Sequence, residues 1–372
     1  MLIGVPKEIK NHEYRVGLTP GSVRELVHHN HRVIIETAAG AGIGVTDDDY
    51  RAAGALVADS AAEIYGSAEL IVKVKEPQDN EYRMLREGQV VFAYFHLAPA
   101  PALTRALMDA GIIAVAYETV TGPGHTLPLL APMSEVAGRL AIQAGAHCLE
   151  RDQGGKGILI GGVPGVAPAR VLIIGGGVVG ENAANVAVGM EADVTLLDRS
   201  LPRLRRLDTH YAGRVKCIYS TKEAVEKYAL ESDLVVGAVL IPGAAAPRLI
   251  TRAIVEGMTK GSVIVDVAID QGGCAETSHP TTHQEPTFVV DGVVHYCVSN
   301  MPGAVPRTSA FALNNATLPF TLALANLGYR RAMQQDPYLL NGLNIHMGKI
   351  TYDAVARALD FDYVPAIEAI SG

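Results

Sequence analysis

The sequence contains few cysteines, and none of them form a closely spaced pair. Its 372 residues include four, Cys148, Cys217, Cys274 and Cys297, which lie far apart. A zinc site or a disulfide framework would need clustered or regularly spaced cysteines, so the sequence predicts neither. A reducing cytoplasm is therefore the expected location.

The chain also lacks an excess of basic residues. It has 31 Lys and Arg residues against 39 Asp and Glu residues, which gives a formal net charge of −8. A nucleic-acid surface needs a basic stripe, and none is present, so no nucleic-acid partner is expected. His28, His29 and His31 are clustered, but neutral histidines at the end of a predicted helix are more often solvated, and no metal site is predicted.

Long apolar runs are missing as well. Residues 1–8 do not combine a basic segment with an apolar core, so a secretory signal is not expected. Between Gly157 and Gly180 the only charged residue is Arg170. Prolines and glycines interrupt this stretch, which favours a loop leading into a buried strand over a membrane span.

One glycine-rich segment has the pattern of a dinucleotide-binding turn. The apolar run 171–174 leads into Gly175, Gly177 and Gly180. In such a turn the first glycine permits the sharp bend, the second lets backbone approach a pyrophosphate, and the third allows close helix packing. The predicted helix 178–190 would direct its positive N-terminal end at the phosphates.

Asp198 directly follows the next strand-like run, 193–197. A carboxylate there accepts hydrogen bonds from the ribose hydroxyls of NAD and repels the additional phosphate of NADP, so NAD is predicted. Arg199 leaves NADP open, because an arginine at this place accommodates a 2′-phosphate or stacks on adenine. Strand, turn, helix, strand and acid in this order are stronger evidence than the glycines alone.

Strand-like apolar runs alternate with helical stretches through most of the chain. The first set of runs is 2–5, 33–36, 70–75, 90–95 and 112–117, with helices at 21–30 and 100–110. The second set is 171–174, 193–197, 215–219, 233–239, 262–269 and 293–298. This alternation is typical of parallel sheets covered by helices on both faces.

Two long helical stretches divide these sets, one at 132–150 and one at 308–332, where Pro319 would introduce a kink. The predicted fold class is α/β, with two doubly wound, Rossmann-like parallel-sheet domains joined by long helices. Residues 1–131 and 305–372 would form the substrate domain. Residues 132–304 would form an inserted NAD-binding domain, with the active site in the interdomain cleft.

Several polar residues follow the predicted strands of the first domain, where ligands bind to parallel sheets. They are Arg15, Lys75, Glu76, His96 and Glu118. Arg15 could grip a carboxylate with two parallel hydrogen bonds, and His96 could transfer a proton near neutral pH. Lys75, which would share a strand face with Lys73, could hold a carbonyl or carboxylate oxygen. Any one of these residues could simply be solvated or bind backbone groups. The prediction of a site therefore depends on their common position after the strands.

In the second domain, Asp270 follows the strand-like run 262–269, where a nicotinamide ring should lie. Its carboxylate could orient the imidazole of His96 or stabilise a cationic intermediate.

Several longer motifs follow one another along the chain. They are Gly4-Val5-Pro6-Lys7-Glu8, Arg15-Val16, Lys73-Val74-Lys75-Glu76-Pro77, His96-Leu97, residues 130–139, residues 161–166, residues 266–273 and Asn300-Met301-Pro302. Together they resemble the alanine dehydrogenase family, which also contains the nucleotide-binding subunit of proton-translocating nicotinamide transhydrogenase. The resemblance runs nearly end to end.

This resemblance implies reversible, NAD-dependent oxidative deamination of L-alanine to pyruvate and ammonia by a homohexamer. His96 and Asp270 would be the catalytic pair, and Arg15, Lys75, Met133 and Asn300 would bind the substrate. The NAD contacts implied by the family are Ser134, Asp198, Arg203, Ser220, Leu240, Asp270 and Val298. Gly176 and the basic stretch 201–207 leave the preference for NAD over NADP less firmly defined.

Two other functions remain open. A transhydrogenase subunit would bind NAD but pass hydride to a second nucleotide on a membrane partner, and it would need no site for a substrate carboxylate. Arg15, Lys75 and His96 together favour a dehydrogenase. A non-catalytic NAD-binding protein would bind the nucleotide and turn over no amino acid.

Overall fold

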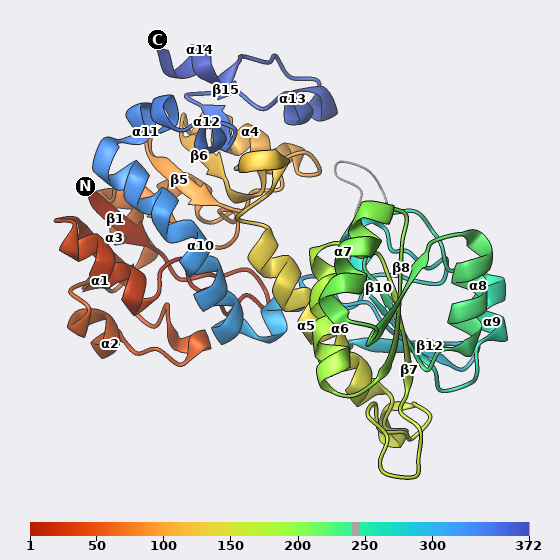
Figure 1. The fold of residues 1–372 in the computed structure, drawn as a ribbon. Coiled ribbons are helices and arrows are strands. Elements are labelled where there is room, and N and C mark those ends of the chain that lie inside the picture. The colour runs from red at the N-terminus through yellow and green to blue at the C-terminus, as the bar shows by residue number, and fades with distance from the viewer. Residues whose placement is uncertain (240–245, 372) are drawn as a thin grey trace. The chain divides into compact units, whose positions relative to one another are not determined.

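The chain forms two compact units, described by a computed structural model over residues 1–239 and 246–371 (Figure 1). Unit 1 comprises Met1–Met133 and the residues from Val305 onward, and unit 2 comprises Ser134–Ala304. The division falls within helix α5, Ala131–Cys148. The sequence-based boundary lay two residues earlier, between residues 131 and 132.

Unit 1 contains an eight-stranded sheet within the described residues, in the order β15-β14-β6-β5-β4-β1-β2-β3. The strands are β1 Leu2–Val5, β2 Arg32–Glu36, β3 Leu56–Ala58, β4 Leu70–Val72, β5 Val90–Ala93, β6 Ile113–Ala116, β14 Leu343–His346 and β15 Lys349–Ile350. The first six pair in parallel, whereas β14 is antiparallel to β6 and β15 to β14. The edge strands β14 and β15 therefore extend a sheet that was predicted to be parallel throughout.

Helices accompany the strands of unit 1 along the chain. They are α1 Pro20–His28, α2 Asp47–Ala52, α3 Ala61–Ser67, α4 Pro101–Asp109, α10 Pro306–Leu327, α11 Tyr329–Gln335, α12 Pro337–Leu340, α13 Asp353–Leu359 and α14 Ala366–Ser371. Helix α10, blue in Figure 1, contacts the red helix α1. Asn314 on α10 accepts hydrogen bonds from the Thr19 amide (2.7 Å) and the Ser22 hydroxyl (2.9 Å), which attaches the C-terminal segment to the N-terminal one.

The strand order of unit 1 reverses at β1. The chain runs from β1 to β2 and β3 on one side and then returns to place β4 on the other side. Loops that leave adjacent strands at such a reversal diverge and leave room for a ligand beyond the carboxyl ends. The loop after β1 carries Arg15, and the segment after β4 carries Lys75.

Unit 2 contains a seven-stranded sheet within the described residues, in the order β12-β13-β11-β10-β7-β8-β9. Its strands are β7 Arg170–Ile174, β8 Asp193–Asp198, β9 Val215–Tyr219, β10 Leu234–Gly237, β11 Val263–Asp266, β12 Thr287–Val290 and β13 Val293–Tyr296. Its helices after α5 are α6 Val178–Gly189, α7 Leu201–Tyr211, α8 Lys222–Glu231 and α9 Arg252–Gly257. Six strands are parallel and β12 is antiparallel to β13. The order reverses at β7, which lies between β8 and β10 and leads into the glycine-rich turn.

Some predicted elements were too long. The strand predicted for residues 90–95 ends at Ala93, and the one predicted for 70–75 ends at Val72. Just beyond these ends, the amides of Val74 and Phe95 donate to carboxylate oxygens of Glu8 and Glu118. These amides bind side chains instead of a neighbouring strand, although the Tyr94 amide still donates to the Val74 carbonyl oxygen (3.1 Å). Hydropathy alone does not reveal this change.

The predicted helix 308–332 is also divided. Helix α10 ends at Leu327, because Gly328 has φ +72° and ψ 154°, and α11 begins at Tyr329. Pro319 lies inside α10. None of the helices in residues 1–239 and 246–371 combines the length and the apolar character needed to cross a membrane.

Candidate functional site

The guanidinium of Arg15 is almost completely buried and is held by Glu13. Arg15 is 2% exposed, and its Nε and Nη2 donate to Glu13 Oε1 (2.7 Å) and Oε2 (2.6 Å). Its Nη1 lies 3.0 Å from the sulfur of Met133. Burial would raise the pKa of Glu13, but the hydrogen bonds and charge of Arg15 outweigh it and lower that pKa. The two-pronged grip predicted for a substrate carboxylate is thus made with Glu13 in this structure.

Lys73 and Lys75 have different neighbours, although strand alternation predicted a shared face. Strand β4 ends at Val72, so the alternation argument does not apply to either lysine. Lys73 is fully buried between Glu81 (3.0 Å) and Glu8 (3.4 Å). Burial disfavours its charge, but the two carboxylates outweigh that effect and raise its pKa.

Lys75 lies in a more positive environment. Burial and the nearby charge of Arg15 lower the pKa of Lys75, with Glu13 opposing them. The side chain is partly exposed, unlike that of Lys73. Of the two lysines, Lys75 is therefore the one available to a ligand beside Arg15.

His96 occupies an unusual backbone conformation at the end of β5. Its φ is +50°, in the left-handed region, which costs a residue with a Cβ about 1–2 kcal/mol. The side chain is exposed, and its ring stacks on Tyr94 with an interplanar angle of 8° and a centroid distance of 6.0 Å. Tyr94 is in turn close enough to Arg15 for the positive charge to influence its pKa, although burial dominates and raises that pKa. Tyr94 therefore links the predicted proton-transfer residue to the predicted carboxylate site.

Glu13 and Tyr94 were not identified from the sequence. Each precedes a predicted site residue by two positions, Glu13 before Arg15 and Tyr94 before His96. These residues lie outside strands, and His96 has φ +50°, so strand alternation gave no signal for either of them.

In unit 2, the three glycines of the turn have distinct steric environments. Gly175 has φ +105°, and a Cβ there would lie 2.6 Å from the carbonyl oxygen of Ala238. A Cβ on Gly180 would lie 1.8 Å from the carbonyl oxygen of Gly175. Gly177, which precedes the first turn of α6, faces open space instead. The turn thus leaves an accessible helix N-terminus, which suits the binding of an anion.

Asp198 lies at the end of β8 and is joined to the glycine turn. Its Oδ2 accepts from the Gly176 amide (2.7 Å), and its Oδ1 accepts from the Ser200 amide (2.7 Å). The amide of Ser220, just after β9, donates to the carbonyl oxygen of Asp198 (3.0 Å). The structure therefore brings Asp198, Ser220 and the glycine turn together at the carboxyl ends of β7, β8 and β9.

Arg203 extends this cluster from the first turn of α7. Its Nη2 donates to Glu181 on α6 (2.6 Å), and its Nε donates to the carbonyl oxygen of Gly176. Its Nη1 is buried without a hydrogen-bond partner among the described residues. An unpartnered guanidinium nitrogen beside an open helix N-terminus fits a bound phosphate group. The residues present in unit 2 are therefore suited to a dinucleotide.

Asp270 lies in a one-turn helix over Val267–Gln271 rather than at the end of a strand, because β11 ends at Asp266. The side chain of Asp270 is exposed. Its segment is anchored by Asp266, which is fully buried and accepts from the amides of Ala268 (3.2 Å) and Cys274 (2.9 Å). The Asp266 carboxylate also accepts from the Ala275 amide (3.2 Å) and the Ser278 hydroxyl (2.6 Å). Both ends of the segment that carries Asp270 are thereby attached to one carboxylate.

The remaining predicted contacts vary in their surroundings. Val298 is fully buried, so contact with a nucleotide would involve its backbone. Asn300 has φ +62° and lies near Met301–Ala304, a short 3₁₀ helix. Ser134, in α5, is partly exposed. Leu240 lies outside the described residues.

No group of three or more histidine, cysteine or acidic residues in the described part of the chain has the geometry of a metal site. In the histidine cluster, the rings of His28 and His29 contact edge to face, and His31 bonds to Asn326 (2.8 Å). All four cysteines are free thiols.

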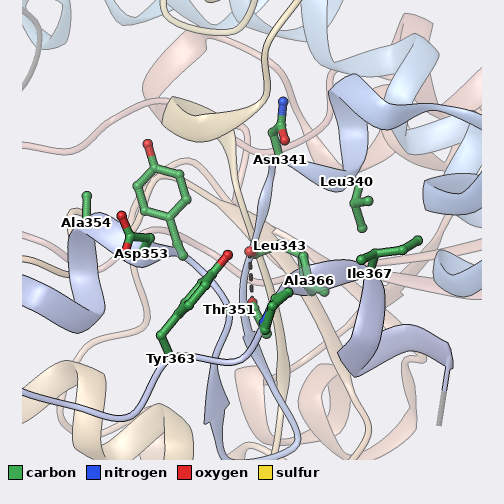
Figure 2. A pocket seen from close by; sticks show the side chains of 11 residues that line it. Leu340, Asn341, Leu343, Thr351, Asp353, Ala354, Tyr363, Ala366 and Ile367 are labelled. Carbon is green, nitrogen blue, oxygen red and sulfur yellow. Dashed lines mark hydrogen bonds between the residues drawn. The ribbon is translucent and has the colours of Figure 1, made fainter.

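A cavity of about 410 Å³ lies in unit 1, apart from the predicted site residues. Its lining comes from the segments around α12, β14, α13 and α14 (Figure 2). A hydrogen bond from the Thr351 hydroxyl to the Leu343 carbonyl (2.9 Å) joins two of its walls. The lining contains no residue predicted to bind substrate, so this cavity does not correspond to the predicted site.

Two family models match consecutive parts of the chain. Residues 4–137 match the Alanine dehydrogenase/PNT N-terminal domain, and residues 141–353 match the Alanine dehydrogenase/PNT C-terminal domain.

Individual relatives agree with these matches. The chain is 61% identical to an alanine dehydrogenase of Halomonas elongata over 370 residues, with 100% of both chains covered. A solved L-alanine dehydrogenase has a TM-score of 0.95 and 53% identity, covering 97% of this chain and 99% of the other. A transhydrogenase from Sinorhizobium meliloti is more distant, with a TM-score of 0.81 and 25% identity over 95% of this chain and 100% of the other. The resemblance predicted from the motifs is confirmed, and the chain belongs to the Alanine dehydrogenase/PNT family.

Proposed function

We propose that the protein catalyses the reversible, NAD-dependent oxidative deamination of L-alanine to pyruvate and ammonia. The observation that carries this proposal is the placement of Arg15, Lys75 and His96 beyond the carboxyl ends of the parallel strands β1, β4 and β5 of one sheet. Tyr94 stacks on His96 and lies within electrostatic range of Arg15, so these side chains form one connected group. The 61% identity to an alanine dehydrogenase along the whole chain supports the choice of substrate.

Two charged residues, Arg15 and Lys75, are proposed to bind the oxygen atoms of pyruvate. Arg15 and Lys75 supply positive charge for the carboxylate and the carbonyl oxygen, and Met133 provides an apolar boundary beside Arg15. Because Glu13 already occupies one edge of the guanidinium, Arg15 is held in place before substrate binds. A group fixed in advance loses less conformational entropy when the ligand arrives. Asn300 of unit 2 is proposed as a further substrate contact.

His96 is proposed to donate a proton to the departing hydroxyl group when ammonia has added to pyruvate, and to accept a proton in the reverse direction. Asp270 would orient the imidazole or stabilise the positively charged imine. The dinucleotide, when bound, supplies or takes up the hydride. The proposal requires that residues of both units act on one substrate during turnover. Because oxidation needs the uncharged amine, activity toward alanine should rise with pH.

The cluster around the glycine turn is proposed to hold NAD. Gly175, Gly177 and Gly180 shape the turn, and Arg203 and the N-terminus of α6 would meet the phosphates. Ser134, Ser220, Leu240, Asp270 and Val298 would complete the set. Asp198 would bind the ribose and disfavour NADP, while exposed Arg199 is positioned next to it in the sequence.

Substitution of Asp198 by Ala tests this assignment. We expect the ratio of kcat/KM for NADH to that for NADPH to fall roughly 10-fold or more, since a hydrogen bond to a charged group contributes about 1.5–3 kcal/mol. Steady-state kinetics with both coenzymes would measure the ratio. Asp198→Asn is the matched control for the turn, because it retains an acceptor for the Gly176 amide. An unchanged ratio in both variants would remove Asp198 from the ribose site.

One assay distinguishes the candidate activities. The purified protein is mixed with NADH, ammonium and a panel of 2-oxo acids, and the loss of reduced nicotinamide absorbance is followed. Consumption with pyruvate but not with larger oxo acids is the expected result. Hydride transfer to a second nucleotide without any oxo acid would support a transhydrogenase component. Binding of NADH with no turnover would indicate a non-catalytic protein.

A homohexameric assembly and a cytoplasmic location complete the proposal. The free cysteines are compatible with a reducing compartment. The assembly rests on the family resemblance, and light scattering of the purified protein would test it.

A further inference from the structure

The backbone of His96 lies in the left-handed region, and its amide is bound by Glu118, a residue of the short 3₁₀ helix Tyr117–Thr119 that follows β6. Strands β5 and β6 pair in register with Ala93 opposite Ala116, so Glu118 emerges beside the end of β5. Its Oε1 accepts from the amides of Phe95 (3.1 Å) and His96 (2.7 Å), and its Oε2 lies 3.3 Å from the Phe95 amide. Two successive N–H groups that converge on one anion form a nest, a conformation that requires a residue of unusual φ. The φ of +50° at His96 is therefore coupled to the carboxylate of Glu118.

The ring of His96 is oriented by the aromatic residues behind it. It lies parallel to Tyr94, whose hydroxyl donates to the carbonyl oxygen of Leu129. Tyr94 also contacts Tyr117 edge to face at 5.0 Å, and Tyr117 contacts Phe92 at 4.3 Å. These rings are buried, so Tyr94 offers a fixed surface. The imidazole lies parallel to this surface with residue 96 in the left-handed conformation.

We propose that Glu118 is a positioning residue for proton transfer by His96. It acts by binding the Phe95 and His96 amides, which sets the backbone of His96 and the stacking of its ring on Tyr94. Glu118 itself need not touch the substrate. This inference rests on the proposed function, because it assigns His96 the proton-transfer step.

Glu118→Gln is the direct test, since it preserves the size of the side chain and removes the charge that the nest binds. We expect kcat for amination of pyruvate to fall roughly 10- to 100-fold, as small displacements of reacting groups have effects of that order. KM for pyruvate and Kd for NADH should remain within about twofold of the wild-type values, because the residues that bind them are unchanged. Glu118→Asp is a second variant that keeps the charge but is one methylene shorter, and an intermediate kcat is expected.

A double-mutant cycle separates positioning from a general structural role. Asn tolerates left-handed backbone, so His96→Asn removes the imidazole while keeping the conformation. In that background Glu118→Gln should cause no further loss of kcat, because its effect passes through His96. A loss of equal size in both backgrounds would overturn the proposal.

Asp47 provides a matched control in the same unit. Its carboxylate accepts from the amide of Ala38 (2.8 Å), a residue with φ +57°, and from the hydroxyl of Thr37 (2.7 Å). Asp47→Asn therefore removes the charge of a similar anchor away from His96, and kcat should not change. A decrease as large as that of Glu118→Gln would show a nonspecific effect and overturn the proposal.

Crystal structures of the ligand-free wild type and Glu118→Gln give a readout independent of activity. The variant should show residue 96 displaced from φ near +50° and its ring no longer parallel to Tyr94. An unchanged loop would overturn the inference even if kcat fell. Absence of turnover in the wild type would instead overturn the proposed function, while the structural comparison would still test the hold of Glu118 on His96.

Discussion

His96→Ala is expected to lower turnover of pyruvate and ammonium by roughly 10²- to 10⁴-fold, the usual contribution of a positioned acid–base group. Binding of NADH should be retained, because the residues proposed to hold the dinucleotide lie in unit 2. Stopped-flow or steady-state absorbance measurements would give kcat, and nucleotide fluorescence would give Kd for NADH. Near-normal turnover with intact binding would refute the role of His96.

The backbone conformation at residue 96 determines which variant is most informative. Alanine is unfavourable at φ +50°, so His96→Ala removes the imidazole and also destabilises the local turn. His96→Asn avoids this ambiguity and should lose kcat to a similar extent. His29→Ala, which removes an exposed histidine next to the end of α1, is the control and should leave kcat unchanged.

Lys73→Met is expected to cause the largest loss of stability. Lys73 is fully buried between Glu8 and Glu81, and Glu81 also accepts from the Tyr65 hydroxyl (2.9 Å). Removing the cation leaves two carboxylates buried without their counter-charge, which typically costs about 3–5 kcal/mol. The chain has 14 tyrosines and no tryptophan, so urea unfolding can be followed by tyrosine fluorescence and circular dichroism.

An exposed ion pair of the same unit provides the control for Lys73. Arg51 is 56% exposed and pairs with Asp48, which is 90% exposed, at 2.7 Å. Arg51→Met should change the free energy of unfolding by no more than about 1 kcal/mol, because water screens such pairs. If Lys73→Met destabilised the protein no more than Arg51→Met, the buried network would not have its assigned role. The variant Lys73→Met with Glu8→Gln and Glu81→Gln should recover part of the loss, since no charge would remain unpaired.

The sequence predicted a site correctly where one short segment contains both the secondary structure and the residues that shape it. The glycine turn is such a case, because the conformation of Gly175 and the contact of Gly180 with the Gly175 carbonyl arise within the turn itself. The order of strand, helix and strand likewise predicted that Asp198 would lie beside this turn, where it binds the Gly176 amide. The covered strands were recognisable because β5 and β6 are buried along their whole length.

Predictions failed where a residue's partner is distant in the chain. Beyond the ends of β4 and β5, the amides of Val74 and Phe95 bind carboxylates from other segments. Lys73 and Lys75, two positions apart, acquired different roles because Glu8 and Glu81 meet only one of them. The antiparallel edge strands β12, β14 and β15 were not predicted from the sequence.

Hydropathy and glycine spacing thus sufficed for the α/β class, the dinucleotide turn and the candidates Arg15, Lys75 and His96, because these features follow from short-range backbone geometry and burial. The pairing of charges required the folded chain. Which donor a carboxylate binds depends on the distance to that donor and on the exposure of both groups to water. Folding determines both. For this reason the hydrogen bond from the His96 amide to Glu118, 22 residues further along the chain, became visible only in the folded structure.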